Sequence, residues 1–358
     1  MQTLMIDTLP ILSLDQAKAY DCTDLSWLIR VLHSMGLCPN LILLIQDMVY
    51  ECHTRVRINS TYSCLYTLSR GVRQGNPLSC LLYAFSIEPM GMQLCSAISG
   101  ISVYDLPPAK LIMYADDMNL FLSTLDNMSL ISDTLTDSSL AISSKFNYEK
   151  TDVLLVGLSC HRSLQVTDPL LAPLLDCFTG AYILPRKSPL HILGIWISSP
   201  NFARDRWEQI AAHILKIICQ WNQIGTLICN CVILAKALLM SCCYYLMDGN
   251  GIPSQMLNKI SGPIMRFVCG RFSLMPYSML AAPLSKGGLN CPSLKDRKLA
   301  YNAKFFSDLI LSPHDSLWKL WTCADLLQVS NYHSSPIGTI PVDPLTQRSH
   351  TTLKLLEP

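Results

Sequence analysis

Two adjacent aspartates, Asp116 and Asp117, interrupt the apolar run LIMYADDMNLFL at residues 111–122. Burying even a neutral polar group without a partner costs roughly 2–7 kcal/mol, so two carboxylates inside such a run need a reason. The apolar segments on both sides predict buried strands that form a tight hairpin with the aspartates at its tip. Adjacent carboxylates repel each other and are driven toward protonation unless a cation lies beside them.

A divalent metal ion resolves this conflict. Mg²⁺ is bound in octahedral geometry by one or two carboxylates together with phosphate oxygens. Two such ions, roughly 3.5–4 Å apart, stabilise the attacking and the leaving oxygen of an in-line phosphoryl transfer. Asp15 ends an apolar strand in LPILSLDQAKAYD and is the natural candidate for a further carboxylate ligand. An ordinary turn, where Asp is common, is the alternative interpretation of the pair, and these residues alone leave both open.

The elements that must position these aspartates are mixed strands and helices up to about residue 200, and helices afterwards. Before the aspartates, the patterns predict a helix over 24–49, a strand hairpin around 59–61, and a helix that begins at Asn76 and Pro77. After them, the patterns predict a helix over 126–144, a strand in TDVLLVG, a loop with one or two short strands over 159–190, a strand in HILGIWIS, long helices over about 204–222, 226–247 and 254–270, and a poorly ordered tail from about 330.

Composition indicates a globular chain with a large core. The 358 residues are 50% hydrophobic and 15% charged, which argues against low-complexity disorder and suggests two or three domains. Residues 204–304 hold 12 Lys and Arg against 4 Asp and Glu, whereas the rest of the chain is net acidic. This asymmetry fits a nucleic-acid clamp beside a metal site, and it fits a scatter of solvated helix faces equally well.

Sixteen cysteines are present, but no C-x2-C pair indicates a zinc site. The opening MQTLMIDTLPIL lacks the basic start of a secretory signal. We therefore expect reduced thiols, mostly in the core, and an intracellular protein, cytoplasmic or nuclear. The most apolar stretch, GTLICNCVILAKALLMSCCYYLM, is broken by Asn230 and Lys236, which favours a buried helix and no membrane partner.

The motifs together resemble a known family. YADD following RGVRQGNPLS, with LDQAKAYD upstream, resembles the reverse transcriptase of LINE-type non-LTR retrotransposons. FNYEKTDVLLVG, LHILGIWIS and APLSKGGLNCPSL resemble later segments of these enzymes, so the resemblance runs from about residue 11 to about 305. It implies an α+β fold, a right-hand polymerase palm with an antiparallel sheet, followed by an all-α thumb. The implied domains are a palm with partial fingers over 1–200, a helical thumb and post-thumb segment over 201–305, and a partly disordered tail over 306–358.

The resemblance implies an RNA-directed DNA polymerase that joins a dNTP to a primer 3′-hydroxyl with two Mg²⁺ or Mn²⁺ ions, on an RNA template with a DNA primer. By role, the matching positions are Asp15, Asp116 and Asp117 for metal binding and catalysis, Lys150 for protonating the leaving pyrophosphate, Tyr20, Arg73, Gln74 and Gly75 for the nucleotide, and Leu193 and Gly194 for the primer end. A packed tyrosine, a surface arginine and a solvated lysine are the ordinary interpretations of Tyr20, Arg73 and Lys150.

The chain also departs from the family pattern. Only 14 residues precede Asp15, where the family has a longer fingers subdomain, so we expect an N-terminally truncated form. Asn76 stands where the family more often has Asp, and Cys22 where it often has a basic residue. One alternative is a catalytically inactive retroelement relic that at most binds RNA or RNA–DNA hybrid. Another is a different metal-dependent phosphotransferase that shares only the paired-Asp hairpin. The oligomeric state cannot be inferred from the sequence.

Overall fold

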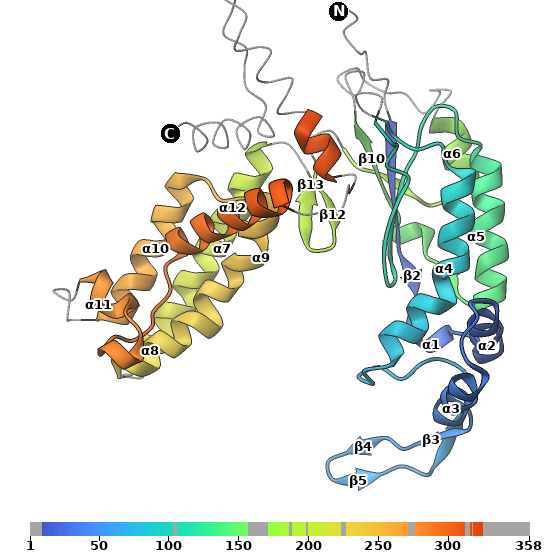
Figure 1. Cartoon of the computed structure of the whole chain (residues 1–358), viewed down its shortest axis with the longest axis horizontal. Coiled ribbons are helices and arrows are strands. Elements are labelled where there is room, and N and C mark those ends of the chain that lie inside the picture. Colours follow the sequence, from blue (N-terminus) through green and yellow to red (C-terminus); the bar gives the residue numbers. More distant parts are fainter. Residues whose placement is uncertain are drawn as a thin grey trace, which may run out of the picture. The chain divides into compact units, whose positions relative to one another are not determined.

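The computed structural model describes residues 9–102, 106–156, 171–185, 188–197, 200–222, 227–270, 276–311, 316 and 318–324. The chain divides into two compact units, Met1–Arg186 and Lys187–Pro358 (Figure 1). The domain bounds drawn from the sequence stay a prediction, and the tail beyond 330 lies outside the described residues.

The first unit is built on a five-stranded sheet with the order β11-β10-β1-β8-β7. The strands are β1 (Leu9–Leu14), β7 (Leu111–Tyr114), β8 (Asp117–Phe121), β10 (Asp152–Val156) and β11 (Tyr182–Ile183). The central strand β1 is antiparallel to β8 and β10, and β11 is parallel to β10. The hairpin predicted around the aspartates is confirmed as β7–β8. Only β8 is buried, however, because β7 forms the edge of the sheet and exposes Ile112 and Tyr114.

Helices cover the apolar face of this sheet. The main ones are α2 (Leu25–Ser34), α4 (Ser79–Ala97) and α5 (Met128–Ile142), and α4 and α5 lie side by side (Figure 1). Alternate residues of the two central strands, Leu12 and Leu14 with Met118 and Leu120, are buried in one core cluster with these helices. The opposite face of these strands carries Ile11 and Phe121 together with the polar residues Ser13 and Asn119.

Several element boundaries differ from the predictions. The helix predicted over 24–49 is two helices, α2 and α3 (Pro39–Val49), because Gly36 at φ +78° ends the first and Pro39 begins the second. Helix α4 begins at Ser79, and Asn76 Oδ1 instead accepts a hydrogen bond from Leu78 N at 3.0 Å. Residues 171–177, predicted as loop, form helix α6 (Leu171–Cys177).

A two-stranded ribbon follows α3. Strands β3 (Cys52–Thr54) and β6 (Tyr66–Leu68) form its base, and β4 (Arg57–Ile58) and β5 (Thr61–Tyr62) form its tip. The predicted turn is confirmed at Asn59 and Ser60, both at positive φ, as a type I′ hairpin turn requires.

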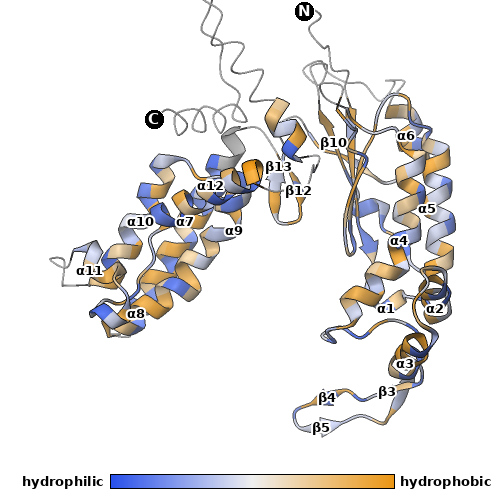
Figure 2. Ribbon diagram, in the orientation of Figure 1, coloured by the Kyte–Doolittle hydropathy of each residue, from blue (hydrophilic) through white to orange (hydrophobic). Residues whose placement is uncertain are grey.

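The second unit opens with a hairpin of β12 (Leu190–Ile192) and β13 (Ile195–Ile197), where a single strand was predicted. Its helices are α7 (Pro200–Asn222), α8 (Ile228–Leu234), a π-helical stretch (Ala235–Met240), α9 (Ser241–Asn250), α10 (Ser254–Cys269), α11 (Tyr277–Ala281) and α12 (Leu294–Leu311). The three predicted long helices are confirmed, and apolar and polar residues alternate around them (Figure 2). Their buried residues form a second core that includes Trp207, Leu239 and Ile260.

The continuous helix Ile228–Asn250 is, within the part of the chain that the structure describes, the one helix long and apolar enough to cross a membrane. It also contributes Val232, Leu239 and Met247 to the core of the second unit. The cysteines differ from expectation in their burial. All 15 described cysteines are free, but only Cys231, Cys243 and Cys291 are buried.

Candidate active site

Three aspartates lie at one end of the central strands. Asp15 directly follows β1, Asp117 opens β8, and Asp116 lies in the turn between β7 and β8. Leu14 pairs with Met118, so the antiparallel register, continued by one residue, brings Asp15 opposite Asp117. The turn is tight, and its other residue, Ala115, adopts a φ of +53° that costs an L-residue free energy.

Asp15 has a cationic neighbour. Lys150 Nζ lies 4.0 Å from Asp15 Oδ2, and the two side chains are 70% and 45% exposed. The 3₁₀ turn Tyr148–Lys150 brings the lysine there, and Asn147 N donates to Asp15 O at 2.8 Å just before it. An ion pair this long and this exposed contributes about 0–1 kcal/mol, so either partner is free to exchange for another ligand.

The exposed carboxylates have the oxygen ligands that Mg²⁺ needs, but too few of them converge in the described part of the chain to hold the ion without a substrate. Asp116 and Asp117 are exposed, and carboxylate oxygens are the ligands this ion prefers. Across the described ranges, however, no group of three His, Cys, Asp or Glu side chains is arranged to hold a metal ion. Mg²⁺ is usually held by one or two carboxylates together with substrate phosphates. The arrangement therefore suits an ion that arrives with a phosphorylated substrate and not an all-protein cage.

Two tyrosines lie beside the aspartate turn. The ring of Tyr20 is 4.6 Å from the ring of Tyr83, centroid to centroid. Burial, the neighbouring Cys80 thiol and the Asp116 carboxylate raise the pKa of Tyr20 to about 12. Burial and Asp116 also raise the pKa of Tyr83. The Asp116 carboxylate acts on both phenols, and both phenols stay neutral at physiological pH.

The loop before α4 is attached to the segment that carries Tyr20. Val72 N donates to Tyr20 O at 2.8 Å. Gly71 has a φ of +83°, and a Cβ there would lie 2.6 Å from Asp21 O, so only glycine fits. Gln74 Nε2 donates to Asp21 Oδ1 at 3.3 Å. The loop that carries Gln74 is thus joined to the segment that carries Tyr20.

The next residues of this loop are placed differently. Gly75 has a φ of +84° with open space where a Cβ would lie, so its conformation and not crowding favours glycine. The guanidinium of Arg73 donates to His53 O at 3.3 Å, at the base of the ribbon, while Ser79 Oγ donates to Arg73 O. Arg73 is therefore partly engaged in joining the loop to the ribbon.

A buried polar network that the sequence did not reveal lies under Asp15. The Tyr83 hydroxyl donates to Gln16 Oε1, and Gln16 Nε2 donates to Ser144 Oγ at 2.6 Å. All three residues are at most 5% exposed. Gln16 is the residue after Asp15 and lies on the short strand β2 (Gln16–Ala17), which pairs with β9 (Lys145–Phe146). No local signal in the sequence indicated this network, because Gln16 follows Asp15 directly and Lys18 lies two residues further on.

The predicted primer residues lie in the second unit. Leu193 (φ +49°) and Gly194 (φ +78°) form the two-residue turn between β12 and β13. The Tyr245 hydroxyl donates to Leu193 O, and a Cβ on Gly194 would lie 2.8 Å from the Tyr245 ring. Asn250 exchanges two hydrogen bonds with the backbone of Trp196, at 2.7 and 3.2 Å. These contacts attach the hairpin to helix α9.

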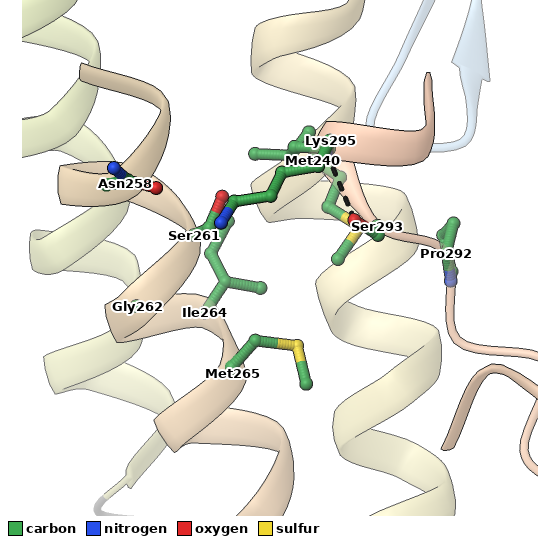
Figure 3. A pocket seen from close by; sticks show the side chains of 10 residues that line it. Met240, Asn258, Ser261, Gly262, Ile264, Met265, Pro292, Ser293 and Lys295 are labelled. Atoms are coloured by element: carbon green, nitrogen blue, oxygen red, sulfur yellow. Dashed lines mark hydrogen bonds between the residues drawn. The ribbon is translucent and has the colours of Figure 1, made fainter. Parts of the chain in front are cut away.

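A cavity of about 430 Å³ lies elsewhere in the second unit, between the π-helical stretch, α10 and the start of α12 (Figure 3). Its lining includes Met240, Ile264, Met265 and Leu294, with Lys295 as the charged residue. It contains none of the predicted site residues, and its mostly apolar lining offers nothing for phosphoryl chemistry.

Comparison with known proteins identifies the family of this chain. Residues 5–197 match the family described as reverse transcriptase (RNA-dependent DNA polymerase). A 149 kDa uncharacterized protein of transposon TX1 from Xenopus laevis is 32% identical over 152 residues, which is 42% of this chain and 12% of that protein. This chain therefore spans a small part of the curated relative that it matches. The predicted resemblance to retrotransposon reverse transcriptases is confirmed.

A solved structure of telomerase from Candida tropicalis, in complex with a fragment of telomeric RNA, is similar at 12% identity and a TM-score of 0.39. The match covers 89% of this chain and 50% of the telomerase chain. A similarity of that level says nothing about function. The family match covers more than half of the chain, including the aspartate hairpin, the loop before α4 and strand β1, which Asp15 follows. This chain belongs to the reverse transcriptase (RNA-dependent DNA polymerase) family.

Proposed function

We propose that this chain carries out RNA-directed DNA synthesis, in which a primer 3′-hydroxyl attacks the α-phosphate of a dNTP opposite an RNA template. Membership of the family supports the class of reaction. The observation that carries the proposal is the strand register, which sets Asp15 after β1 opposite Asp117 at the start of β8, with Asp116 one residue before it. The Asp15 side chain is 45% exposed, and Asp116 and Asp117 are exposed, so a triphosphate has access to them.

In this proposal, Asp15, Asp116 and Asp117 hold two Mg²⁺ or Mn²⁺ ions. When bound, the ions neutralise phosphate charge and align the attacking and leaving oxygens. The chain contributes positioning, because each aspartate lies on, or one residue from, a strand of the same sheet. Positioning of reacting groups accounts for up to roughly 7–11 kcal/mol of a barrier.

Tyr20, Gln74, Gly75 and Arg73 are proposed to bind the nucleotide. The pair of stacked rings gives Tyr20 a firm base on which a sugar can pack. The hydrogen bond from Gln74 to Asp21 is long and exposed, so the amide can turn to a substrate at little cost. The turn at Leu193 and Gly194 is proposed to hold the primer end.

Lys150 is proposed to act on the leaving pyrophosphate. It is 70% exposed, and its weak ion pair with Asp15 leaves the ammonium available to a substrate phosphate; a metal ion held by Asp15 would weaken that pair further. In this role the Lys150 ammonium would donate a proton to the departing phosphate oxygen, or neutralise its charge.

A second candidate function is binding without catalysis, as expected of an inactive retroelement relic that at most holds RNA or RNA–DNA hybrid. The observation that favours it is the arrangement of the carboxylates. Asp15 faces Lys150, and within the described residues no three metal ligands converge. The cytoplasmic or nuclear location stays a prediction.

Primer extension distinguishes the two functions. The assay combines the purified chain, an RNA template, a DNA primer, labelled dNTPs, and Mg²⁺ or Mn²⁺. We expect extension by the wild type and its loss in Asp116→Ala/Asp117→Ala. The matched control is Asp133→Ala/Asp137→Ala, which removes two exposed carboxylates from α5 and is expected to keep activity. No extension with either metal, in a folded chain that still binds hybrid, would refute the polymerase and support the binding protein.

A further inference from the structure

The ribbon Cys52–Leu68 buries almost nothing. Every residue from Arg55 to Thr67 is exposed, and Ile58 at the tip is 66% exposed. A two-stranded hairpin alone is marginally stable in water. This one extends from the end of α3 as an arm, clear of the five-stranded sheet of its own unit (Figure 1). An exposed arm of this kind indicates a binding surface more than a structural support.

The two faces of the arm differ in chemistry. Alternation along the strand puts Arg55 and Arg57 on one face, and Val56 and Ile58 on the other. Arg57 pairs with Tyr62 across the ribbon, and its guanidinium lies 5.7 Å from the centre of the Tyr62 ring. The first face, here called the basic face, therefore carries the two arginines and Tyr62. The second, here called the aliphatic face, carries Val56 and Ile58, with Tyr66 opposite Thr54 near the base.

A bulge turns the tip relative to the base. Thr54 pairs with Tyr66, whereas Ser63 N donates to Val56 O at 2.9 Å. Arg55 therefore lies opposite two residues, 64 and 65, instead of one. Bulges of this type bend a ribbon and redirect side chains. Arg55 lies at the bend, two residues from the stacked pair of Arg57 and Tyr62.

The positive charge of the arm indicates which kind of partner it binds. The segment 52–68 holds two arginines and no Asp or Glu. Arginine binds phosphate through two parallel hydrogen bonds, and an exposed aromatic ring stacks on an unpaired base. The combination is that of single-strand binding surfaces, which join a basic track to stacking rings.

We propose that the basic face of the arm, formed by Arg55, Arg57 and Tyr62, binds single-stranded template. This inference rests on the proposed function, because it names the partner of the same unit. The base of the arm is joined to the nucleotide loop by the hydrogen bond from Arg73 to His53 O. Template held on the arm is thus held by an element attached to the loop that carries Gln74.

The test measures binding without catalysis. A fluorescent single-stranded RNA is titrated with the full chain, without dNTP or divalent metal, over a series of salt concentrations. We expect Arg55→Ala/Arg57→Ala to weaken binding about tenfold and to reduce the slope of log K against log salt by about 1.4, which corresponds to two phosphate contacts on a single strand. Tyr62→Ala is expected to weaken binding about tenfold, and Tyr62→Phe, which keeps the ring, by less than twofold.

Two controls match these changes. Arg30→Ala removes a guanidinium that also lies 5.7 Å from an aromatic ring, that of Trp27 on α2, and is expected to leave binding unchanged. Arg55→Lys/Arg57→Lys keeps the charge, so it keeps the salt slope and shows that the arm tolerates substitution. Unchanged affinity and slope in Arg55→Ala/Arg57→Ala would overturn the inference. So would a loss of RNA binding confined to Val56→Ser/Ile58→Ser, because it would assign the partner to the aliphatic face.

The outcomes separate this inference from the proposed function. If wild type binds RNA through the arm but extends no primer, the inference stands and the polymerase is refuted. If wild type extends primers and the arm variants bind as well as wild type, the polymerase stands and the inference fails.

Discussion

The buried network under Asp15 makes a sharp prediction about Tyr83. Replacing Tyr83 with Phe keeps the ring that packs against Tyr20 and removes the hydroxyl that donates to Gln16 Oε1. Gln16 is 5% exposed, so water cannot replace the lost donor. A buried acceptor left without a partner costs about 1–3 kcal/mol, and we expect the first unit to lose that much stability.

A double-mutant cycle with Gln16→Leu tests whether this loss belongs to the hydrogen bond. Gln16→Leu alone leaves the hydroxyls of Tyr83 and Ser144 unpaired, so it is expected to cost more than Tyr83→Phe. In the double variant both partners are apolar, and the cost should fall below the sum of the single changes by roughly 0.5–3 kcal/mol. Tyr148→Phe, which removes a hydroxyl from a ring packed edge-on against Phe178, is the matched control and should cost less.

Hydrogen exchange measured by mass spectrometry localises the effect. Strands β2 and β9 pair beside the network, so peptides that contain Gln16 and Lys145 should exchange faster in Tyr83→Phe. Peptides of the second unit should be unchanged. Wild-type exchange at β2 in Tyr83→Phe, or strictly additive costs in the cycle, would refute the role of the network.

The remaining predictions concern ionisation and backbone geometry. The pKa of Tyr20 is raised to about 12 and that of Tyr83 is also raised, so the folded chain keeps phenolic protons that the unfolded chain releases above pH 10. The free energy of unfolding should therefore fall as pH rises above 10, and less steeply in Tyr83→Phe. Urea midpoints measured between pH 9 and 11.5 would show this. Gly71→Ala should destabilise the first unit by more than about 2 kcal/mol, because it combines positive φ with a clash against the Asp21 backbone. Gly75→Ala, at nearly the same φ in open space, should cost about 1–2 kcal/mol. Equal losses in thermal denaturation would contradict this. Leu193→Asn should stabilise the β12–β13 hairpin by about 1 kcal/mol, because Asn tolerates the positive φ of a type I′ turn, and slower exchange of the hairpin amides would show it.

Local patterns were enough to place the parts of the site that depend on local chain geometry. The apolar runs around Asp116 and Asp117 predicted a hairpin with the aspartates at its tip, and the structure has it. Asp15 was likewise expected at the end of a strand. Both predictions rest on short-range alternation, which a single sequence displays directly.

Features set by distant neighbours were not predictable in the same way. LIMY has the composition of a buried strand, but its position at the sheet edge follows from topology. In the sequence, Gln16 is 67 residues from Tyr83 and 128 residues from Ser144, so no local pattern connects them. Helix α6 was missed because of its proline, Pro173, which lies in the first turn, where the missing N–H has no helical partner to lose.

The ribbon has a consequence for how the chain can change in length. Its two ends meet at the pair Cys52 and Leu68, so whatever lies beyond them can grow or shrink without moving the sheet or the nucleotide loop. The length of the arm can change, but only in steps that keep each side chain on its face. Because successive residues point to opposite faces, adding one residue to each strand would exchange the basic and the aliphatic face beyond the insertion, whereas adding two would preserve them. Related chains are therefore expected to differ in the length of this arm by steps of two residues per strand.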